Sequence, residues 1–552
     1  MEKIWQKFYD EQVPKSLKYP DTTMYHLFCE AVEKNPKGIA TLFFGAKIRY
    51  EKLFKKVNHF ANALSALGVK KGDRVALILP NFPIYPIAHL AVMKLGGILV
   101  PTNPLYVERE LVYQLNNAEA ETVVILDQIY PRLEKVRKDA RVKRVIVTGV
   151  KDFLPGVIGF LYGLKHKPQI QTNEKKNLYV YSDLMRKDFP PAQTADVSSN
   201  DTAILLYTGG TTGVSKGAVL THKNLVANVL QTKAWLWSIE EGKEVLLCVL
   251  PFFHSYGMTT GLHLSIASHS TMFLVPRFEL SEVIKRIKKH KPTIFCGVPS
   301  MYNAINHYPG VSGSDVGSIR LCVSGGAALP EEVQKNFEEL TGGKLVEGYG
   351  LSETSPVTHV NPIHGYRKSG IGLPISDTDA MIVDLETRKP LPPGEVGELA
   401  IRGPQVMKGY WKMEKETEQV LQNGWLYTGD MAVMDEEGFF SIVDRKKDLI
   451  ISAGMNIYPR EVEEVLHQHP KIKEAAVIGV SSKVREETVK AFVVVKEGEK
   501  LSKSEIIQFC KDKLSKYKIP KEIEFRDELP KSSVGKILKR VLQQEEMKKR
   551  KI

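Results

Sequence analysis

Residues 207–217 read Tyr-Thr-Gly-Gly-Thr-Thr-Gly-Val-Ser-Lys-Gly and directly follow the apolar run Ala-Ile-Leu-Leu at 203–206. An apolar run of this kind predicts a buried strand, and the polar stretch after it predicts a loop. Glycines let successive backbone N–H groups turn inward around an anion, while hydroxyls and a lysine add donors and positive charge. The stretch therefore predicts a phosphate-binding loop, with a polar surface loop as the alternative.

This stretch is similar to two known motifs, the P-loop and the G-x-S-x-G motif of serine hydrolases. A P-loop requires Gly-Lys followed by Ser or Thr, and no such triplet occurs in the sequence. Residues 213–217, Gly-Val-Ser-Lys-Gly, match the G-x-S-x-G pattern of serine hydrolases, which would make Ser215 a nucleophile. So short a pattern arises easily by chance, and a serine hydrolase stays open as an alternative of a different class.

Four further blocks follow the loop along the chain. They are Gly-Tyr-Gly-Leu-Ser-Glu-Thr at 348–354, Tyr-Thr-Gly-Asp at 427–430, Asp-Arg-Lys-Lys-Asp at 444–448 and Pro-Lys-Ser-Ser-Val-Gly-Lys at 530–536. Together with residues 207–217, and in the same order and spacing, they resemble the adenylate-forming superfamily of acyl-CoA synthetases, peptide-synthetase adenylation domains and luciferases. The resemblance covers nearly the full chain.

The resemblance implies a reaction in two halves. A carboxylate attacks the α-phosphate of ATP to give an acyl adenylate and pyrophosphate, and a thiol then attacks the activated carbonyl and expels AMP. Phosphoryl chemistry of this kind depends on positioning and charge neutralisation. The implied cofactors and co-substrates are ATP, Mg²⁺ and coenzyme A.

The blocks also imply which residues bind the nucleotide. Thr208 and Glu353 would bind the magnesium ion, since it prefers oxygen ligands. Tyr349 would lie against the adenine, and Asp430 would accept hydrogen bonds from the ribose hydroxyls with support from Arg445. The full implied set for ATP and AMP is Thr208, Gly209, Gly210, Thr211, Thr212, Gly213, Ser215, Lys216, Gly326, Gly348, Tyr349, Gly350, Thr354, Asp430 and Arg445.

Four more residues receive roles from the resemblance. Lys536 would bridge the attacking carboxylate and the α-phosphate during the first half-reaction. His254, in Pro-Phe-Phe-His-Ser-Tyr-Gly at 251–257, matches a catalytic position near the acyl pocket, and a hydrogen-bonded core histidine is the alternative. Gly454 would line the pantetheine tunnel for CoA, and Lys447 would be the hinge between two domains.

The apolar pattern predicts an α/β chain. Short β-branched runs at 75–79, 123–126, 145–147, 245–250 and 293–296 predict buried strands. Between them, apolar residues from Leu53 to Leu64 recur at helical spacing and stop at Gly68, as in an amphipathic helix with a glycine C-cap. Strands that alternate with such helices predict mainly parallel sheets covered by helices on both faces.

The character of the sequence changes near residue 444. Residues 439–443 alternate like a strand, Pro459 stands at a predicted helix start, and Ser502 and Glu505 form a capping box. We therefore predict an N-terminal AMP-binding and acyl-binding domain at 1–444 and a small α+β domain at 445–552, which the resemblance makes a mobile lid.

The sequence also indicates the acid. Amino-acid adenylation sites place an Asp where this chain has its Phe-Phe-His block, and residues 245–278 contain no Asp or Glu. An uncharged acyl tail is favoured.

Only residues 537–552 follow Lys536, so we expect free CoA rather than a carrier domain as the acyl acceptor. Residues 344–350 and 403–411 most resemble long-chain fatty acyl-CoA synthetases; medium-chain or aryl acids, and a luciferase-like oxygenase, stay open.

Composition bears on location and partners. The chain has 552 residues and a net charge of +13, and its five scattered cysteines indicate a reducing, cytoplasmic compartment. The apolar residues 154–164 are too few to span a bilayer, which takes about 20. Followed by Lys165, His166 and Lys167, they predict peripheral contact with the inner membrane face, with a packed connector as the alternative. No basic-aromatic run indicates nucleic-acid binding, and the family suggests a homodimer.

Overall fold

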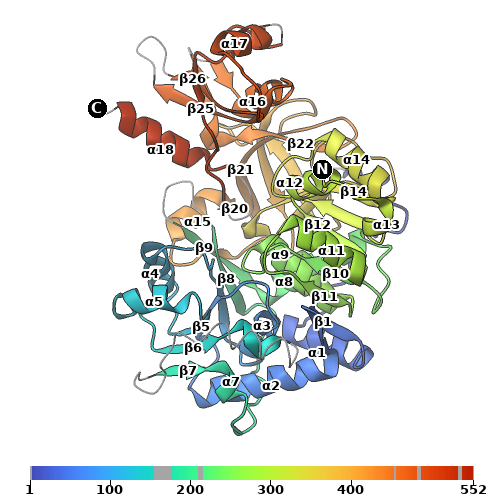
Figure 1. Cartoon of the computed structure of the whole chain (residues 1–552), viewed down its shortest axis with the longest axis vertical. Helices are drawn as coiled ribbons and strands as arrows, with labels where there is room; N and C mark the ends of the chain where they lie inside the picture. Colours follow the sequence, from blue (N-terminus) through green and yellow to red (C-terminus); the bar gives the residue numbers. More distant parts are fainter. Residues whose placement is uncertain are drawn as a thin grey trace. The chain divides into compact units, whose positions relative to one another are not determined.

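The computed structural model describes residues 3–154, 177–208, 215–452, 455–481, 487–511, 513–532 and 537–550. By internal packing the chain forms two compact units. The first comprises Met1–Asp379 and Ile401–Leu426, and the second comprises Ala380–Ala400 and Tyr427–Ile552. Figure 1 traces both units, coloured along the sequence.

One eight-stranded sheet of the first unit carries the predicted phosphate loop. Its strand order is β19-β9-β8-β4-β3-β5-β6-β7, and the six strands from β8 to β7 are parallel. Strands β9 and β19 continue the sheet in antiparallel pairings. The strands are β3 (Arg74–Ile78), β4 (Ile98–Pro101), β5 (Thr122–Leu126), β6 (Arg144–Thr148), β7 (Leu178–Val180), β8 (Thr202–Thr208), β9 (Lys216–Thr221) and β19 (Gly409–Tyr410).

A second, nine-stranded sheet of the same unit has the order β16-β15-β14-β13-β12-β10-β11-β1-β2. Its six central strands are parallel, as the sequence predicted, and antiparallel strands extend both edges. The strands are β1 (Ile39–Phe43), β2 (Ala46–Arg49), β10 (Val245–Cys248), β11 (Thr271–Leu274), β12 (Ile294–Gly297), β13 (Leu321–Ser324), β14 (Lys344–Gly350), β15 (Val357–Val360) and β16 (Leu373–Pro374).

Helices pack on these sheets through apolar faces. Leu111 and Leu133, on α4 and α5, belong to one buried cluster with Val123 and Val145 of β5 and β6, and Figure 1 shows the two helices beside these strands. The α-helices of the first unit are α1 (Met24–Lys34), α2 (Tyr50–Ala66), α3 (Ile84–Lys94), α4 (Glu108–Asn117), α5 (Tyr130–Val136), α7 (Tyr181–Leu184), α8 (His222–Trp235), α9 (Ser255–Gly257), α10 (Leu264–Ala267), α11 (Leu280–His290), α12 (Pro299–Asn306), α13 (Gly313–Val316), α14 (Glu331–Thr341) and α15 (Glu414–Val420).

Shorter elements complete the first unit. Helix α2 follows the predicted pattern: Leu53, Val57, Phe60 and Leu64 are buried, and Gly68 just past its end has a φ of +89°. A left-handed residue at this position favours glycine, which explains where the helix stops. The remaining elements are the 3₁₀ helices η1 (Ile4–Phe8), η2 (Arg137–Asp139), η3 (Val150–Phe153) and η5 (Ser352–Thr354), the π-helix η4 (Met258–His263) and the short strand β20 (Leu421–Gln422).

Within the second unit, the described residues from 445 onward have the α+β character that the sequence predicted. Strands β25 and β26 pair antiparallel, β27 adds to β26 in parallel, and α16 and α17 enclose one apolar core with Val477 and Val493. Glu505 and Ser502 form the predicted capping box. The elements are β17 (Asp379–Val383), β18 (Gly397–Arg402), β21 (Trp425–Met434), β22 (Phe440–Arg445), η6 (Lys446–Asp448), β23 (Ile450–Ser452), β24 (Met455–Ile457), α16 (Pro459–His467), β25 (Ile472–Ser481), β26 (Glu487–Val495), α17 (Lys503–Lys511), β27 (Glu522–Phe525) and α18 (Lys539–Arg550).

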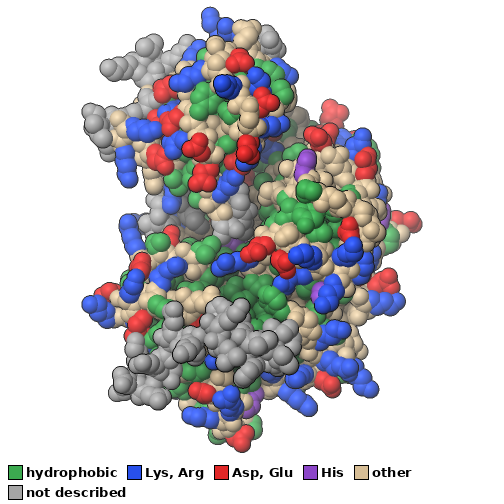
Figure 2. Space-filling model, viewed as in Figure 1, with side chains coloured by type: hydrophobic (Ala, Val, Ile, Leu, Met, Phe, Trp, Pro, Cys, Tyr) green, Lys and Arg blue, Asp and Glu red, His purple; other side chains and the backbone are tan. Residues whose placement is uncertain are grey.

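The surface charge is distributed rather than gathered. Figure 2 shows Lys and Arg side chains interspersed with Asp and Glu over the visible face. Among the described residues, no helix has the length and apolar content that a membrane span requires. Of the segment 154–164, only Leu154 lies within the described residues, so the predicted membrane contact stays a prediction.

Candidate active site

The described ends of the predicted phosphate loop are held by a strand pair. Thr208 ends β8 and Lys216 begins β9, and the two residues are partners in the antiparallel register. The Ser215 hydroxyl donates to the Thr208 carbonyl oxygen at 2.6 Å, and the Tyr113 hydroxyl donates to the Ser215 carbonyl oxygen at 2.8 Å. Ser215 thus uses its hydroxyl within the hairpin, unlike a nucleophile that faces a histidine. Gly209, Gly210, Thr211, Thr212 and Gly213 lie outside the described residues.

Tyr410 connects the loop lysine with the predicted metal ligand. Strand β19 pairs with β9, and this pairing brings the Tyr410 ring to 5.1 Å from the Lys216 Nζ atom. The Tyr410 hydroxyl donates to Glu353 Oε1 at 2.8 Å. The Glu353 backbone oxygen also accepts a hydrogen bond from Met407 N at 2.8 Å. Lys216 and Glu353 therefore contact the same aromatic side chain, which the sequence analysis had not singled out.

The end of β14 makes a tight approach to the loop that follows it. A Cβ atom at Gly350 would lie 2.0 Å from the Pro356 carbonyl oxygen, so only glycine fits there. Thr354 is fully buried, and its hydroxyl donates to the Pro356 oxygen at 2.5 Å and accepts from Leu351 N at 3.1 Å. The Thr354 side chain thus shapes the turn that carries Glu353.

A cavity of about 160 Å³ begins beside these residues. It connects predicted nucleotide-binding residues, Gly326 and Tyr349 among them, with Trp235 and Leu236 at the end of α8. Every described residue that lines the cavity is uncharged. They are Thr232, Trp235, Leu236, Ser255, Tyr256, Thr260, Val323, Gly325, Gly326, Gly348, Tyr349, Gly350, Leu351, Ser352, Pro356, Val357 and Val360. A cavity lined in this way suits an apolar ligand.

His254 lies in the loop that leads from β10 to this cavity. The sequence predicted a strand through residue 250, but β10 ends at Cys248 because the backbone turns there, with Val249 N donating to Leu247 O at 3.2 Å. The loop that follows carries His254 just before Ser255, which lines the cavity. Burial lowers the pKa of His254 to about 4, so the imidazole is neutral at pH 7.

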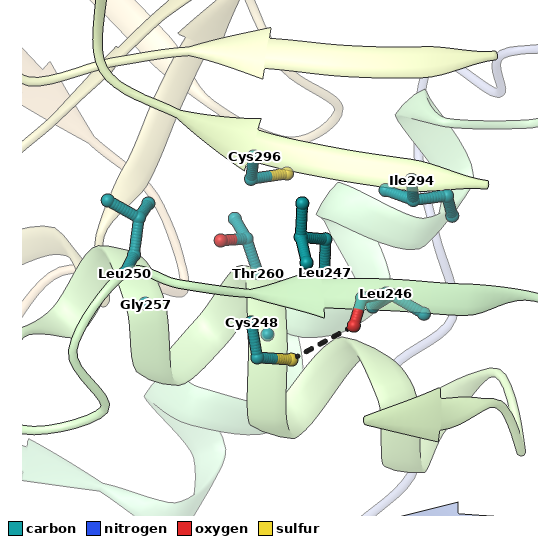
Figure 3. A pocket seen from close by; sticks show the side chains of 9 residues that line it. Leu246, Leu247, Cys248, Leu250, Gly257, Thr260, Ile294 and Cys296 are labelled. Atoms are coloured by element: carbon teal, nitrogen blue, oxygen red, sulfur yellow. Dashed lines mark hydrogen bonds between the residues drawn. The ribbon is translucent and has the colours of Figure 1, made fainter. Parts of the chain in front are cut away.

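A second, much smaller cavity of about 10 Å³ lies between β10, β12 and the π-helix (Figure 3). Cys248 and Cys296 line it, and Thr260 lines both cavities. The Cys248 thiol donates to the Leu246 carbonyl oxygen at 3.3 Å, and burial raises the pKa of Cys296 to about 11. These thiols are therefore protonated at neutral pH, as predicted for buried free cysteines.

In the second unit, Asp430 and Arg445 form an ion pair. They face each other across β21 and β22, with Arg445 Nε 3.0 Å from Asp430 Oδ1. Asp430 is buried, and its backbone N–H donates to the Thr428 hydroxyl at 3.1 Å. Next to it, Gly429 N donates to Glu398 Oε1 at 3.0 Å. The pair predicted from the separate blocks at 427–430 and 444–448 is therefore formed.

Three predicted residues belong to the later part of the chain. Lys447 lies in η6, directly after β22, with its side chain exposed. Gly454 and Lys536 lie outside the described residues. On either side of the latter, Lys531 and Ile537 form an isolated antiparallel bridge, and Lys531 pairs with Glu474.

These features are those of the adenylate-forming class: two mainly parallel sheets, a glycine-rich strand end and a neutral cavity beside it. The chain belongs to the AMP-binding enzyme family. The model of this family matches residues 28–411, and that of the AMP-binding enzyme C-terminal domain matches residues 461–536.

Full-length relatives carry more specific names. The chain is 46% identical to a long-chain-fatty-acid–CoA ligase of Bacillus subtilis (strain 168), over 99% of this chain and 98% of the relative. A ligase of the same name from Escherichia coli O6:H1 is 38% identical over the same shares. Among solved structures, ATP-bound MatB from Rhodopseudomonas palustris superimposes with a TM-score of 0.84 at 29% identity, covering 95% of this chain and 99% of that one.

Proposed function

We propose that this protein is a long-chain fatty acid–CoA ligase. It activates the carboxylate of a fatty acid with ATP, releases pyrophosphate, and transfers the acyl group from the adenylate to CoA with release of AMP. The observation that carries the proposal is the uncharged cavity that runs from the nucleotide residues Gly326, Gly348 and Tyr349 to Trp235. The names of the full-length relatives support the same substrate class.

In the first half-reaction, the loop from Thr208 to Lys216 holds the β- and γ-phosphates of ATP. The oxygen atoms that Glu353 and Thr208 offer fit Mg²⁺, because this ion is usually held by one or two carboxylates together with substrate phosphates. Glu353 and Thr208 would hold it, and it would neutralise phosphate charge. Among the described residues, no group of three or more His, Cys, Asp or Glu forms a separate metal cage, which suits a shared site of this kind.

The remaining roles concern the nucleotide and the carboxylate. Asp430, oriented by its ion pair with Arg445, accepts hydrogen bonds from the ribose hydroxyls. Lys536 neutralises charge between the attacking carboxylate and the α-phosphate. His254 is neutral and directly precedes Ser255, which lines the cavity, so it acts as a polar positioning group rather than as a cation.

The second half-reaction uses the C-terminal part of the chain. In this proposal a domain of residues 445–552 turns about Lys447, and Gly454 lets the pantetheine arm of CoA approach the adenylate. The position of Lys447 in η6, directly after β22, is compatible with a hinge.

The test is ATP-dependent formation of AMP and pyrophosphate with saturated acids from butanoic to octadecanoic, with and without CoA. We expect AMP release that requires both CoA and a long-chain acid. Pyrophosphate exchange without CoA-dependent turnover would show a different acceptor, and no exchange with any acid would overturn the proposal.

The cellular setting is part of the proposal. We place the ligase in the cytoplasm, with contact between residues 154–164 and the inner membrane face, and with a homodimer as its assembly. Co-sedimentation with anionic lipid vesicles tests the contact, and light scattering tests the assembly.

A further inference from the structure

Trp235, at the end of α8, lines the cavity. Along the β14 and β15 ladder, Gly350 pairs with Val357 and Gly348 pairs with Val360. One residue further, the Asn361 carbonyl oxygen accepts a hydrogen bond from Trp235 Nε1 at 3.1 Å. The indole therefore lines the cavity at the end of the ladder away from Leu351 and Ser352.

The space in front of this indole is limited. A cavity of about 150 Å³ holds a single benzene molecule in another protein. The cavity described here has a volume of about 160 Å³ and also borders the nucleotide residues Gly326 and Tyr349. A long acyl tail must therefore pass or displace the Trp235 side chain, which is only 2% exposed.

The N-terminal segment supports Trp235 from behind. The Tyr9 ring meets the indole edge-on, with a centroid distance of 4.8 Å and an interplanar angle of 77°. Tyr9 is not among the cavity-lining residues, so its contact with Trp235 lies outside the cavity. The Tyr9 hydroxyl donates to the Pro374 carbonyl oxygen at 2.5 Å, which fixes the ring in this place.

The next residue anchors the same segment a second time. Asp10 Oδ2 accepts hydrogen bonds from Trp237 Nε1 at 3.0 Å and from His364 N at 3.1 Å. Asp10 is buried, and the backbone approaches it closely, since a Cβ atom at Gly365 would lie 2.5 Å from Asp10 Oδ1. The segment is thus held to both Trp237 and the loop after β15.

This support comes from residues outside the family pattern. The family model begins at residue 28, whereas Tyr9 and Asp10 precede it. The nucleotide residues that line the cavity, Gly326, Gly348 and Tyr349, lie within the matched range. The depth of the cavity can therefore differ between relatives without any change in these three residues.

We propose that Tyr9 is a specificity-determining positioning residue, which sets the length of acyl chain the protein accepts by holding Trp235 at the end of the cavity. The inference rests on the proposed function, because it concerns the acyl group of the same reaction. Removal of the Tyr9 ring leaves space into which the indole retracts, so that the cavity lengthens.

The test is kcat/KM for saturated acids from hexanoic to octadecanoic with the full chain and its Tyr9→Ala, Tyr9→Leu and Tyr9→Phe variants. Burial of each methylene contributes about 0.8 kcal/mol. We therefore expect Tyr9→Ala to raise kcat/KM for acids beyond the wild-type optimum about tenfold relative to shorter acids, chiefly through KM, since two further methylenes find room. Tyr9→Leu should shift the optimum less, and Tyr9→Phe not at all.

Tyr19→Ala is the matched control. Tyr19 is another N-terminal tyrosine, and its hydroxyl donates to Asp377 Oδ2 at 2.7 Å, close in sequence to Pro374. It should lower stability without changing the chain-length optimum. If Tyr9→Ala does not fold, Tyr9→Leu decides the question. An unchanged optimum in Tyr9→Leu, or an equal shift in Tyr19→Ala, overturns the inference, whereas a wild-type chain that activates no fatty acid overturns the proposed function instead.

Discussion

The Tyr410 hydroxyl donates to the Glu353 carboxylate at 2.8 Å, while the ring of the same tyrosine lies 5.1 Å from the Lys216 ammonium. Burial, and next the charge of Glu353, raise the pKa of Tyr410, so the phenol stays protonated and remains a donor. The proposed metal ligand Glu353, in η5, is therefore oriented by Tyr410, a residue of strand β19.

Tyr410→Phe removes this donor and keeps the ring. We expect kcat/KM for ATP to fall roughly tenfold, since a hydrogen bond to a charged group contributes about 1.5–3 kcal/mol and water replaces part of it. The Mg²⁺ concentration at half-maximal rate should rise as well. Tyr25→Phe, which removes a hydroxyl bonded to Asn58 at 3.2 Å, is the control with unchanged kinetics. If Tyr410→Phe and the wild type have the same kinetics, the Tyr410 hydroxyl does not orient the proposed metal ligand.

Asp430→Ala removes the proposed ribose acceptor and leaves Arg445 without this partner. We expect KM for ATP to rise about tenfold to a hundredfold, the usual effect of losing charge-assisted hydrogen bonds. Lys446→Gln breaks the adjacent ion pair with Glu398, whose atoms lie 3.0 Å apart, and should leave KM unchanged. An equal rise of KM for ATP in both variants would mean that ATP binding depends on the integrity of the local sheet and not on the Asp430 carboxylate.

Lys536→Ala separates the two half-reactions. Adenylate formation should lose on the order of 3 kcal/mol of transition-state stabilisation, which is about a hundredfold in rate. Thioester formation from supplied acyl adenylate and CoA should continue. The measurement is pyrophosphate exchange against CoA-dependent consumption of the adenylate, with Lys531→Ala as a neighbouring lysine control. Loss of both half-reactions to the same degree would contradict the assigned role.

Stability should fall in mild acid. Burial lowers the pKa of His222 to about 4 and those of His263 and His359 to about 3, from 6.5. Between these values the unfolded chain binds protons that the folded chain does not, so stability present above pH 6.5 is lost as the pH falls toward 4. At about 1.4 kcal/mol per pKa unit, the shift corresponds to at most about 3 kcal/mol for His222 and about 5 kcal/mol each for His263 and His359.

The measurement is the thermal midpoint from about pH 7 to about pH 5, a range in which ordinary carboxyl groups stay ionised. We expect a steady decrease, and a shallower one in His222→Gln, which removes one of the buried groups. A midpoint that is constant over this range would show that these histidines accept protons without loss of structure.

Much of the architecture could be predicted because it follows from local pattern. The runs at 123–126 and 145–147 became β5 and β6, and the glycine after α2 stands where the helix ends. The Asp430 and Arg445 pair was found because two recognisable blocks carry it. The spacing of apolar residues along the sequence, however, does not show which distant segments pair as strands. Strand β19 has only two residues, and its pairing with β9, which positions Tyr410, has no local signal.

The cavity shows the same limit. The absence of Asp and Glu from residues 245–278 indicated an uncharged tail, and the lining residues agree. Its closed end depends on a contact between Tyr9 and Trp235 that bridges more than two hundred residues of chain. The side chains that determine depth therefore could not be identified from the sequence.

The second compact unit is assembled from two stretches of chain, since Ala380–Ala400 belongs to it although Ile401–Leu426 returns to the first unit. During translation residues 380–400 leave the ribosome before residues 401–426, so the first unit is completed only after part of the second has been made. A gene fragment that starts at Tyr427 would lack β17 and β18, and β21 would present an unpaired edge, which favours aggregation. Dissection of this protein into autonomous pieces requires residues 380–400 to be carried with the C-terminal piece.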